Sequence, residues 1–116
     1  MFNSRKSERF RSQARARIGD ALVGDAILKD LSVTGCCIEC TMVADIKPNV
    51  SYQIEIIPEG AAHIGTFEVT AESRWVRTGG YSCEIGFLIT ASPKGKLFQR
   101  YVDYLDYRSS TESPAE

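Results

Sequence analysis

The chain has 116 residues and a net charge of −1, with 43% hydrophobic and 25% charged residues, which matches one globular domain with its own core. The apolar content excludes a wholly disordered chain. Because no apolar run is longer than three residues, a membrane-spanning helix, which needs about 20 apolar residues, is also excluded.

Positive charge is concentrated at the N-terminus. Residues 1–17 hold six basic residues and one acidic residue, a net charge of +5, whereas the remainder holds 8 basic and 14 acidic residues, a net charge of −6. Residues 1–12 contain few apolar side chains whose burial could offset the entropy cost of ordering this segment. We therefore expect them to form a flexible basic arm that binds an anion. The arm lacks the apolar segment of a secretory signal, and we expect a cytoplasmic protein.

From Ala14 onward, apolar and polar residues alternate with a period of two, which is typical of strands with one buried face. Five such runs and a weaker one cover residues 14–18, 23–29, 36–41, 52–56, 67–75 and 81–89. Gly and Pro turn signals separate the runs. The pattern predicts an all-β protein of antiparallel strands, folded as a small barrel or a sandwich, because closing the sheet removes its exposed edges.

A C-terminal α-helix follows the strands. Ser92 and Pro93 suit the N-cap and first helical position, and apolar residues then recur every three or four positions up to Leu105. We expect this apolar stripe to pack against the barrel. The resulting division is a basic arm over 1–12, a barrel with its helix over 13–107 and a disordered tail over 108–116.

The cysteines and the single histidine do not form a catalytic or metal-binding pattern. In a reducing compartment the four thiols, Cys36, Cys37, Cys40 and Cys83, are expected to be small buried side chains. A zinc site on Cys37 and Cys40 would need two further ligands, and the strand period puts these two on opposite faces. We therefore expect no enzyme activity, no metal and no cofactor.

Two short motifs carry the chemical information. Arg5 and Arg9 form an RxxxR motif in the basic arm, and Asp30, Ser32 and Gly35 form a DxSxxG motif after the second predicted strand. Random placement of this composition would produce the second motif about 0.06 times, so it is the more informative of the two.

RxxxR, a gap of 20 residues and DxSxxG, on a six-stranded antiparallel chain that ends in a helix, resemble a PilZ domain over nearly the whole chain. The resemblance implies a six-stranded antiparallel β-barrel with a C-terminal α-helix. The resemblance implies a bacterial receptor for the second messenger cyclic di-GMP (c-di-GMP). It also implies that Arg5, Arg9, Asp30, Ser32 and Gly35 bind this ligand and that the arm folds over it. The signal would then pass to an unidentified protein partner, with no membrane span.

The residue types suit such a ligand independently of the resemblance. Each arginine fork can pair with phosphate oxygens or with guanine O6 and N7. Asp30 can accept hydrogen bonds from the N1–H and N2–H₂ edge of guanine. Ser32 offers a small hydroxyl group, and Gly35 permits a backbone path that a Cβ would obstruct.

Four alternatives remain open. Arg11 and Arg15 also fit RxxxR, but they belong to the alternating run of the first strand, so Arg5 and Arg9 are preferred. Asp30, Ser32 and Gly35 alone would also suit a plain turn. As a whole protein, the chain could be a PilZ-like adaptor that binds no nucleotide. Nucleic acid is a weaker candidate, because the basic residues lack an interleaved aromatic platform.

Overall fold

The computed structural model describes residues 9–19, 26–40, 46–79, 82–91 and 97–112. Its elements, in chain order, are β1 (Phe10–Arg11), β2 (Arg15–Arg17), β3 (Ala26–Leu31), β4 (Gly35–Cys40), β5 (Ser51–Ile57), a 3-10 turn (Gly60–Ala62), β6 (Phe67–Gly79), β7 (Ser82–Ala91) and α1 (Leu97–Glu112). Each of the six predicted strands corresponds to one of β2 to β7, and the predicted helix corresponds to α1.

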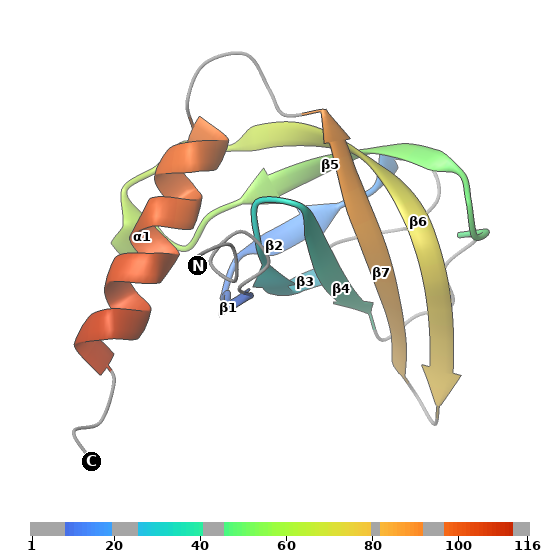
Figure 1. The fold of residues 1–116 in the computed structure, drawn as a ribbon, viewed down its shortest axis with the longest axis horizontal. Helices are drawn as coiled ribbons and strands as arrows, with labels where there is room; N and C mark the ends of the chain where they lie inside the picture. The colour runs from blue at the N-terminus through green and yellow to red at the C-terminus, as the bar shows by residue number, and fades with distance from the viewer. Residues whose placement is uncertain (1–8, 20–25, 41–45, 80–81, 92–96, 113–116) are drawn as a thin grey trace, which may run out of the picture.

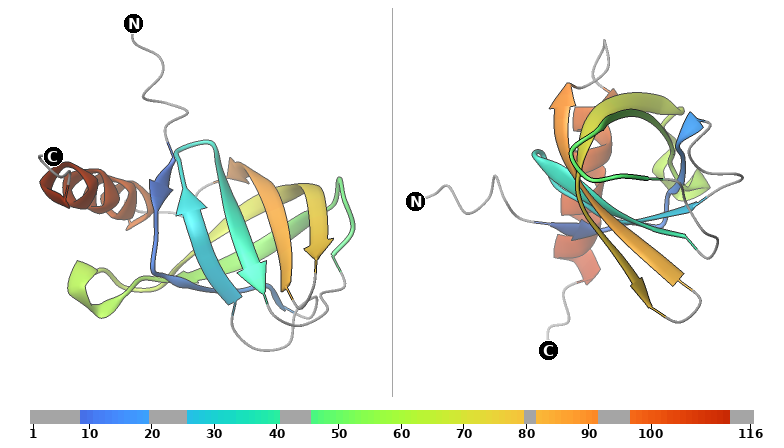
Figure 2. Two further views of the ribbon diagram at one scale, coloured as in Figure 1. Left: turned by 90° about the horizontal axis from the view of Figure 1, so that it is seen from below. Right: turned by 90° about the vertical axis from the view of Figure 1, so that its right-hand side faces the viewer.

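The strands close into an antiparallel barrel. β2 pairs with β3, and the sheet continues through β4, β7, β6 and β5 until β5 pairs again with β2. The ring is visible when the molecule is seen end on (Figure 2, right). β1 also pairs with β3, so β1 and β2 are two parts of one N-terminal strand. The predicted six-stranded barrel is therefore confirmed.

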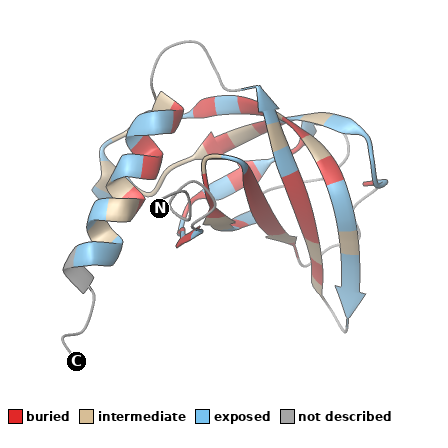
Figure 3. Ribbon diagram, in the orientation of Figure 1, coloured by how far each residue is buried: buried red, intermediate tan, exposed pale blue. Residues whose placement is uncertain are grey.

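The core lies inside the barrel and beneath α1, as Figure 3 shows by burial. The helix lies at one end of the barrel (Figure 1) and buries four apolar or aromatic side chains there, namely Phe98, Tyr101, Val102 and Leu105. Phe67 at the start of β6 meets two of them, with ring centroids 6.2 Å from Phe98 and 6.1 Å from Tyr101. The apolar stripe of the helix thus closes the end of the barrel, as its spacing predicted.

Two predicted boundaries are wrong. The end of the predicted flexible arm belongs to the fold, because Phe10 and Ser12 are buried and alternation runs unbroken from Phe10 to Ile18. The sequence did not reveal that the first strand begins before Ala14, because Ser12 is a polar residue at a buried position. The predicted tail begins too early as well, since α1 continues to Glu112. Residues 1–8 and 113–116, which hold the rest of both predictions, lie outside the described residues.

The alternation in β6 changes face where it was expected to continue. Phe67, Val69, Ala71 and Ser73 are buried, but Trp75 is 39% exposed and the neighbouring Val76 packs against the core. The pairing of β6 with β7 shifts by one residue between Ser73 and Trp75, and such a bulge turns every later side chain to the opposite face. Trp75 therefore lies on the outer surface of the barrel.

Within the described ranges, no helix has both the length and the apolar character needed to cross a bilayer.

Candidate functional site

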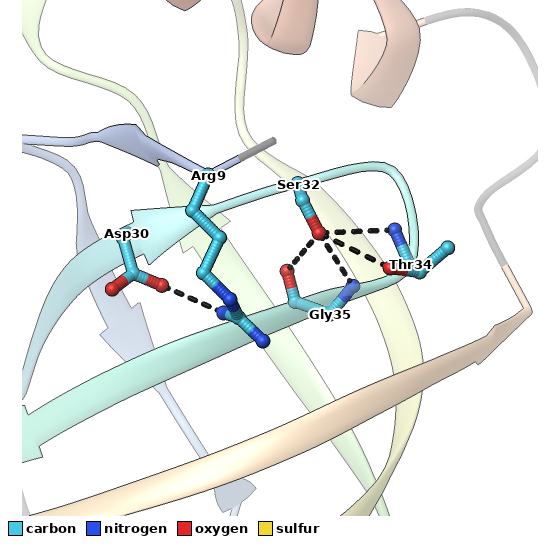
Figure 4. Close-up of polar contacts among 5 residues, drawn as sticks. All are labelled: Arg9, Asp30, Ser32, Thr34 and Gly35. Atoms are coloured by element: carbon cyan, nitrogen blue, oxygen red, sulfur yellow. Dashed lines mark hydrogen bonds and ion pairs between the residues drawn. The ribbon is translucent and has the colours of Figure 1, made fainter. Parts of the chain in front are cut away.

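The DxSxxG motif forms the corner between β3 and β4. Ser32 is 1% exposed, and its hydroxyl oxygen accepts hydrogen bonds from the backbone N–H groups of Gly35 at 3.1 Å and Thr34 at 3.2 Å. Its hydroxyl group also lies 3.3 Å from the Gly35 carbonyl oxygen, to which it donates (Figure 4). The backbone closes the same corner, since the Ser32 N–H donates to the Gly35 carbonyl at 2.8 Å. Ser32 therefore shapes the corner from inside.

Arg9 and Asp30 meet on the outer side of this corner. Arg9 immediately precedes β1, and the pairing of β1 with β3 places Arg11 opposite Asp30. The guanidinium Nη1 of Arg9 donates to Oδ1 of Asp30 at 2.8 Å (Figure 4). The side chains are 49% and 25% exposed, so a molecule arriving from solvent can reach both.

Gly35 is required because its neighbours are close. A Cβ at this position would lie 2.6 Å from the carbonyl oxygen of Phe87 on β7 and 3.4 Å from Nη2 of Arg9. Positive φ is not the reason, because among the described residues it occurs at Gly19, Asn49 and His63. The absent side chain leaves room for the Arg9 guanidinium to lie over the corner.

The structure thus brings together four of the five predicted site residues: Arg9, Asp30, Ser32 and Gly35. Arg5 lies outside the described residues. The four residues differ in exposure to solvent, since Arg9 and Asp30 present polar atoms to solvent whereas Ser32 and Gly35 are buried. The arrangement offers a cationic fork, from the residue before β1, beside a carboxylate near the end of β3.

An outward row of residues leads from Asp30 across the barrel to Trp75. Asp30 is opposite Cys37, Cys37 is opposite Gly86 and Gly86 is opposite Trp75. Three strand spacings separate the ends of the row, which is roughly 14 Å. Because Gly86 has no side chain, the indole ring rests on its backbone; a Cβ there would lie 2.2 Å from Cε2 of Trp75.

Trp75 is the candidate site residue that sequence reasoning missed. The alternating run predicted over residues 67–75 would make this side chain continue the buried face, and the bulge that turns it outward cannot be read from the sequence. Its ring provides the aromatic surface that the basic residues lack. The guanidinium carbon of Arg77 lies 4.9 Å from the ring centroid, so a cationic group already lies over the face of the Trp75 ring.

Charged side chains flank the row. The Glu84 carboxylate on β7 forms an ion pair with the Lys29 ammonium group on β3, and its Oε1 lies 3.9 Å from Nη1 of Arg77 on β6. The hydrogen bond from Lys29 lowers the pKa of Glu84, and the same bond raises the pKa of Lys29. These opposite shifts agree, since each group favours the charged form of the other.

The four cysteine side chains are buried and form no disulfide bond with one another. Burial raises the pKa of Cys37, in the row itself, to about 11 and the pKa of Cys36 to about 12. Near neutral pH both are therefore protonated thiols. This agrees with the expectation that the cysteines are small buried side chains.

Two solved structures share this fold. The inhibitor of motility MotI/DgrA from Bacillus subtilis has a TM-score of 0.74 and 15% sequence identity, over 90% of this chain and 50% of that one. The PilZ domain of YcgR from Escherichia coli, in a structure with c-di-GMP, has a TM-score of 0.66 and 17% identity, over 94% of this chain and 96% of that one. This chain therefore spans half the length of MotI/DgrA and nearly all of the YcgR domain.

No family model matches the chain, and no curated protein sequence matches it. The similarity is thus one of fold: the chain has the fold of a PilZ domain, as the sequence motifs predicted.

Proposed function

We propose that this PilZ-fold protein is a receptor for c-di-GMP. The observation that carries the proposal is the meeting of Arg9 and Asp30, 2.8 Å apart, on the exposed side of the Ser32–Gly35 corner. Support comes from the fold as well, because a PilZ domain with 94% coverage of this chain has a structure with c-di-GMP. We propose a cytoplasmic binding module rather than an enzyme.

Both ends of the ion pair suit this ligand. A cyclic dinucleotide of guanine presents two phosphates and two purine edges, and an arginine fork can donate to either. A carboxylate can accept from N1–H and N2–H₂, which guanine has and adenine lacks. Within the described residues, Oδ2 of Asp30 has no hydrogen-bond partner, so one acceptor oxygen remains available for a guanine.

The existing ion pair does not block the site. Exposed ion pairs contribute about 0–1 kcal/mol, and both side chains here are partly exposed. Contacts with phosphate or guanine can therefore replace the pair at small cost. Trp75 then offers a ring on which a guanine can stack, provided that Arg77 moves aside.

The basic arm supplies the second arginine of the proposed site. With Arg5 and Lys6 near Arg9 in the sequence, residues 1–8 carry charge that opposes two ligand phosphates. We propose that the arm closes over the ligand and that the resulting surface binds a protein partner. Amide hydrogen exchange should show added protection over residues 1–8 when c-di-GMP is present; bound ligand without such protection would exclude closure.

Calorimetric titration with c-di-GMP and, separately, with cyclic di-AMP tests the proposal. Loss of one charge-assisted contact costs about 1.5–3 kcal/mol, so Arg9→Ala should weaken c-di-GMP binding by roughly 10- to 150-fold. Arg100, which is exposed on α1, provides the matched control, and Arg100→Ala should bind like the parent. Cyclic di-AMP should bind the parent far more weakly.

Two results would contradict the proposal. Equal binding of both nucleotides would show that Asp30 does not select guanine. No binding of either one would favour the alternative of a PilZ-like adaptor that acts through protein contacts alone.

A further inference from the structure

A chain of hydrogen bonds joins the residues that follow β1 to α1. The Ala14 N–H donates to the Ser12 hydroxyl at 2.9 Å, and that hydroxyl lies 2.7 Å from the Tyr101 hydroxyl on α1. Tyr101 donates to Oε1 of Glu59 at 2.6 Å. Since the Tyr101 proton is used in this way, Ser12 is the donor to Tyr101.

Arg108 completes the chain from the far end of α1. Its Nη1 donates to Oε2 of Glu59 at 2.8 Å, and its Nη2 donates to the backbone carbonyl of Arg11. We call Ser12, Glu59, Tyr101 and Arg108 the helix clamp. The clamp therefore holds β1 both through the Ser12 side chain and through the Arg11 backbone.

The helix clamp is much less exposed than the Arg9–Asp30 pair. The Arg108 and Glu59 side chains are 18% and 13% exposed, and Tyr101 is fully buried. Burial raises the pKa of Tyr101 above its ordinary range, so the phenol remains a donor. Breaking a shielded, hydrogen-bonded charge pair leaves its partner poorly compensated, and the clamp is accordingly a strong attachment.

The polar bonds matter because apolar packing is thin at this place. A surface hollow of about 340 Å³ lies between α1 and the strands, lined by Arg11, Ser12, Gln13, Ile27, Lys29 and Arg108. β1 itself has only two paired residues, Phe10 and Arg11, each opposite one residue of β3. The position of β1 thus depends on Phe10 burial, the short ladder, the bond from the Ser12 N–H to the Lys29 carbonyl at 3.1 Å and the helix clamp.

We propose that Arg108 is a positioning residue for ligand binding: through the Arg11 carbonyl it fixes β1, and β1 presents Arg9 to Asp30. The inference rests on the proposed function. Coupling between two sites is reciprocal, so a ligand that holds Arg9 must also strengthen the attachment of α1. α1 is then the element through which the ligand-bound state is transmitted beyond β1 and β3.

Arg108→Lys tests the proposal, because lysine keeps the charge but lacks the fork that reaches Glu59 and Arg11 together. Arg100→Lys, at an exposed position of the same helix, is the control. In the ligand-free protein, amide exchange at Ser12, whose N–H donates to the Lys29 carbonyl at 3.1 Å, should become at least several-fold faster in Arg108→Lys and stay unchanged in Arg100→Lys. Affinity for c-di-GMP should fall by roughly 3- to 30-fold in the first variant alone.

The reciprocal effect separates positioning from mere stabilisation. Bound c-di-GMP should slow exchange at Tyr101 and Leu105 in the parent, and should do so much less in Arg108→Lys. Glu59→Gln, which keeps an acceptor for Tyr101 while removing the charge opposite Arg108, should have the same effects and serves if Arg108→Lys unfolds.

Unchanged affinity in a folded Arg108→Lys protein, with c-di-GMP bound by the parent, would overturn this proposal and leave the proposed function intact. Absence of ligand-induced protection in α1 of the parent would also overturn it. A parent that binds no c-di-GMP would overturn the proposed function, and this inference with it.

Discussion

Replacing Ser32 with alanine tests whether this hydroxyl belongs to the fold or to the ligand contacts. Ser32→Ala removes the acceptor of the Gly35 and Thr34 N–H groups. Thr34 is exposed and water can replace its partner, whereas Gly35 is buried and its N–H loses this partner. An unsatisfied buried group costs about 1–3 kcal/mol. Since the lost bonds are at the long end of the usual range, we expect about 1–2 kcal/mol.

Thermal unfolding followed by circular dichroism gives the required measurement. At about 2.1 cal/mol/K per residue, the unfolding entropy of 116 residues is about 0.24 kcal/mol/K, so Tm should fall by about 4–8 °C. Ser109→Ala, at an exposed position on α1, should change the free energy of unfolding by less than about 0.5 kcal/mol. An unchanged Tm in Ser32→Ala together with lost c-di-GMP binding would refute the structural role and make the hydroxyl a ligand group.

Three further predictions concern close contacts and buried thiols. Gly35→Ala places a methyl group 2.6 Å from the Phe87 carbonyl oxygen and should lower the free energy of unfolding by about 1–3 kcal/mol; urea unfolding with an unaltered midpoint would contradict the close approach. Gly86→Ala places a methyl group 2.2–2.6 Å from three indole atoms, so the emission of Trp75, the single tryptophan, should shift to the red, and an unshifted spectrum would count against the packing. Burial raises the pKa of Cys37 to about 11 and of Cys36 to about 12, which lowers the thiolate fraction at pH 8. Iodoacetamide should therefore label the native protein slowly at pH 8 and all four thiols in denaturant; fast native labelling of Cys36 or Cys37 would contradict the pKa shifts.

The strands were predictable because one buried face leaves a period of two in the sequence. β5, the part of β6 up to Ser73 and the apolar stripe of α1 follow this logic directly. The first strand was found only in part, since Ser12 is polar yet buried and is satisfied by Tyr101. That partner is 89 residues away in the chain, so local pattern could not reveal it.

The errors at Trp75 and at the end of α1 have physical causes that sequence pattern does not contain. One extra residue in β6 turns Trp75 outward, although its neighbours alternate regularly. α1 extends past residue 107 because Arg108 bonds with Glu59 and with the Arg11 backbone. Both are consequences of tertiary contacts, which override a local expectation.

The candidate site was located by motif rather than by periodicity. Alternation alone says nothing of which outward residues face one another across strands. The register of β1 with β3 places Arg9 near Asp30, and the register of four strands places Trp75 in the same outward row. The sequence motif therefore indicated the corner, and the sheet register added its aromatic neighbour.

Mapping of amide chemical shifts during titration with c-di-GMP reports where on the barrel the ligand binds. Saturable shifts are expected at Arg9, Asp30 and Gly35, in the indole N–H of Trp75 and over the arm that holds Arg5. Shifts confined to another face, such as the loop around His63, or no shifts at saturating ligand, would rule out a c-di-GMP site at the Arg9–Asp30 corner.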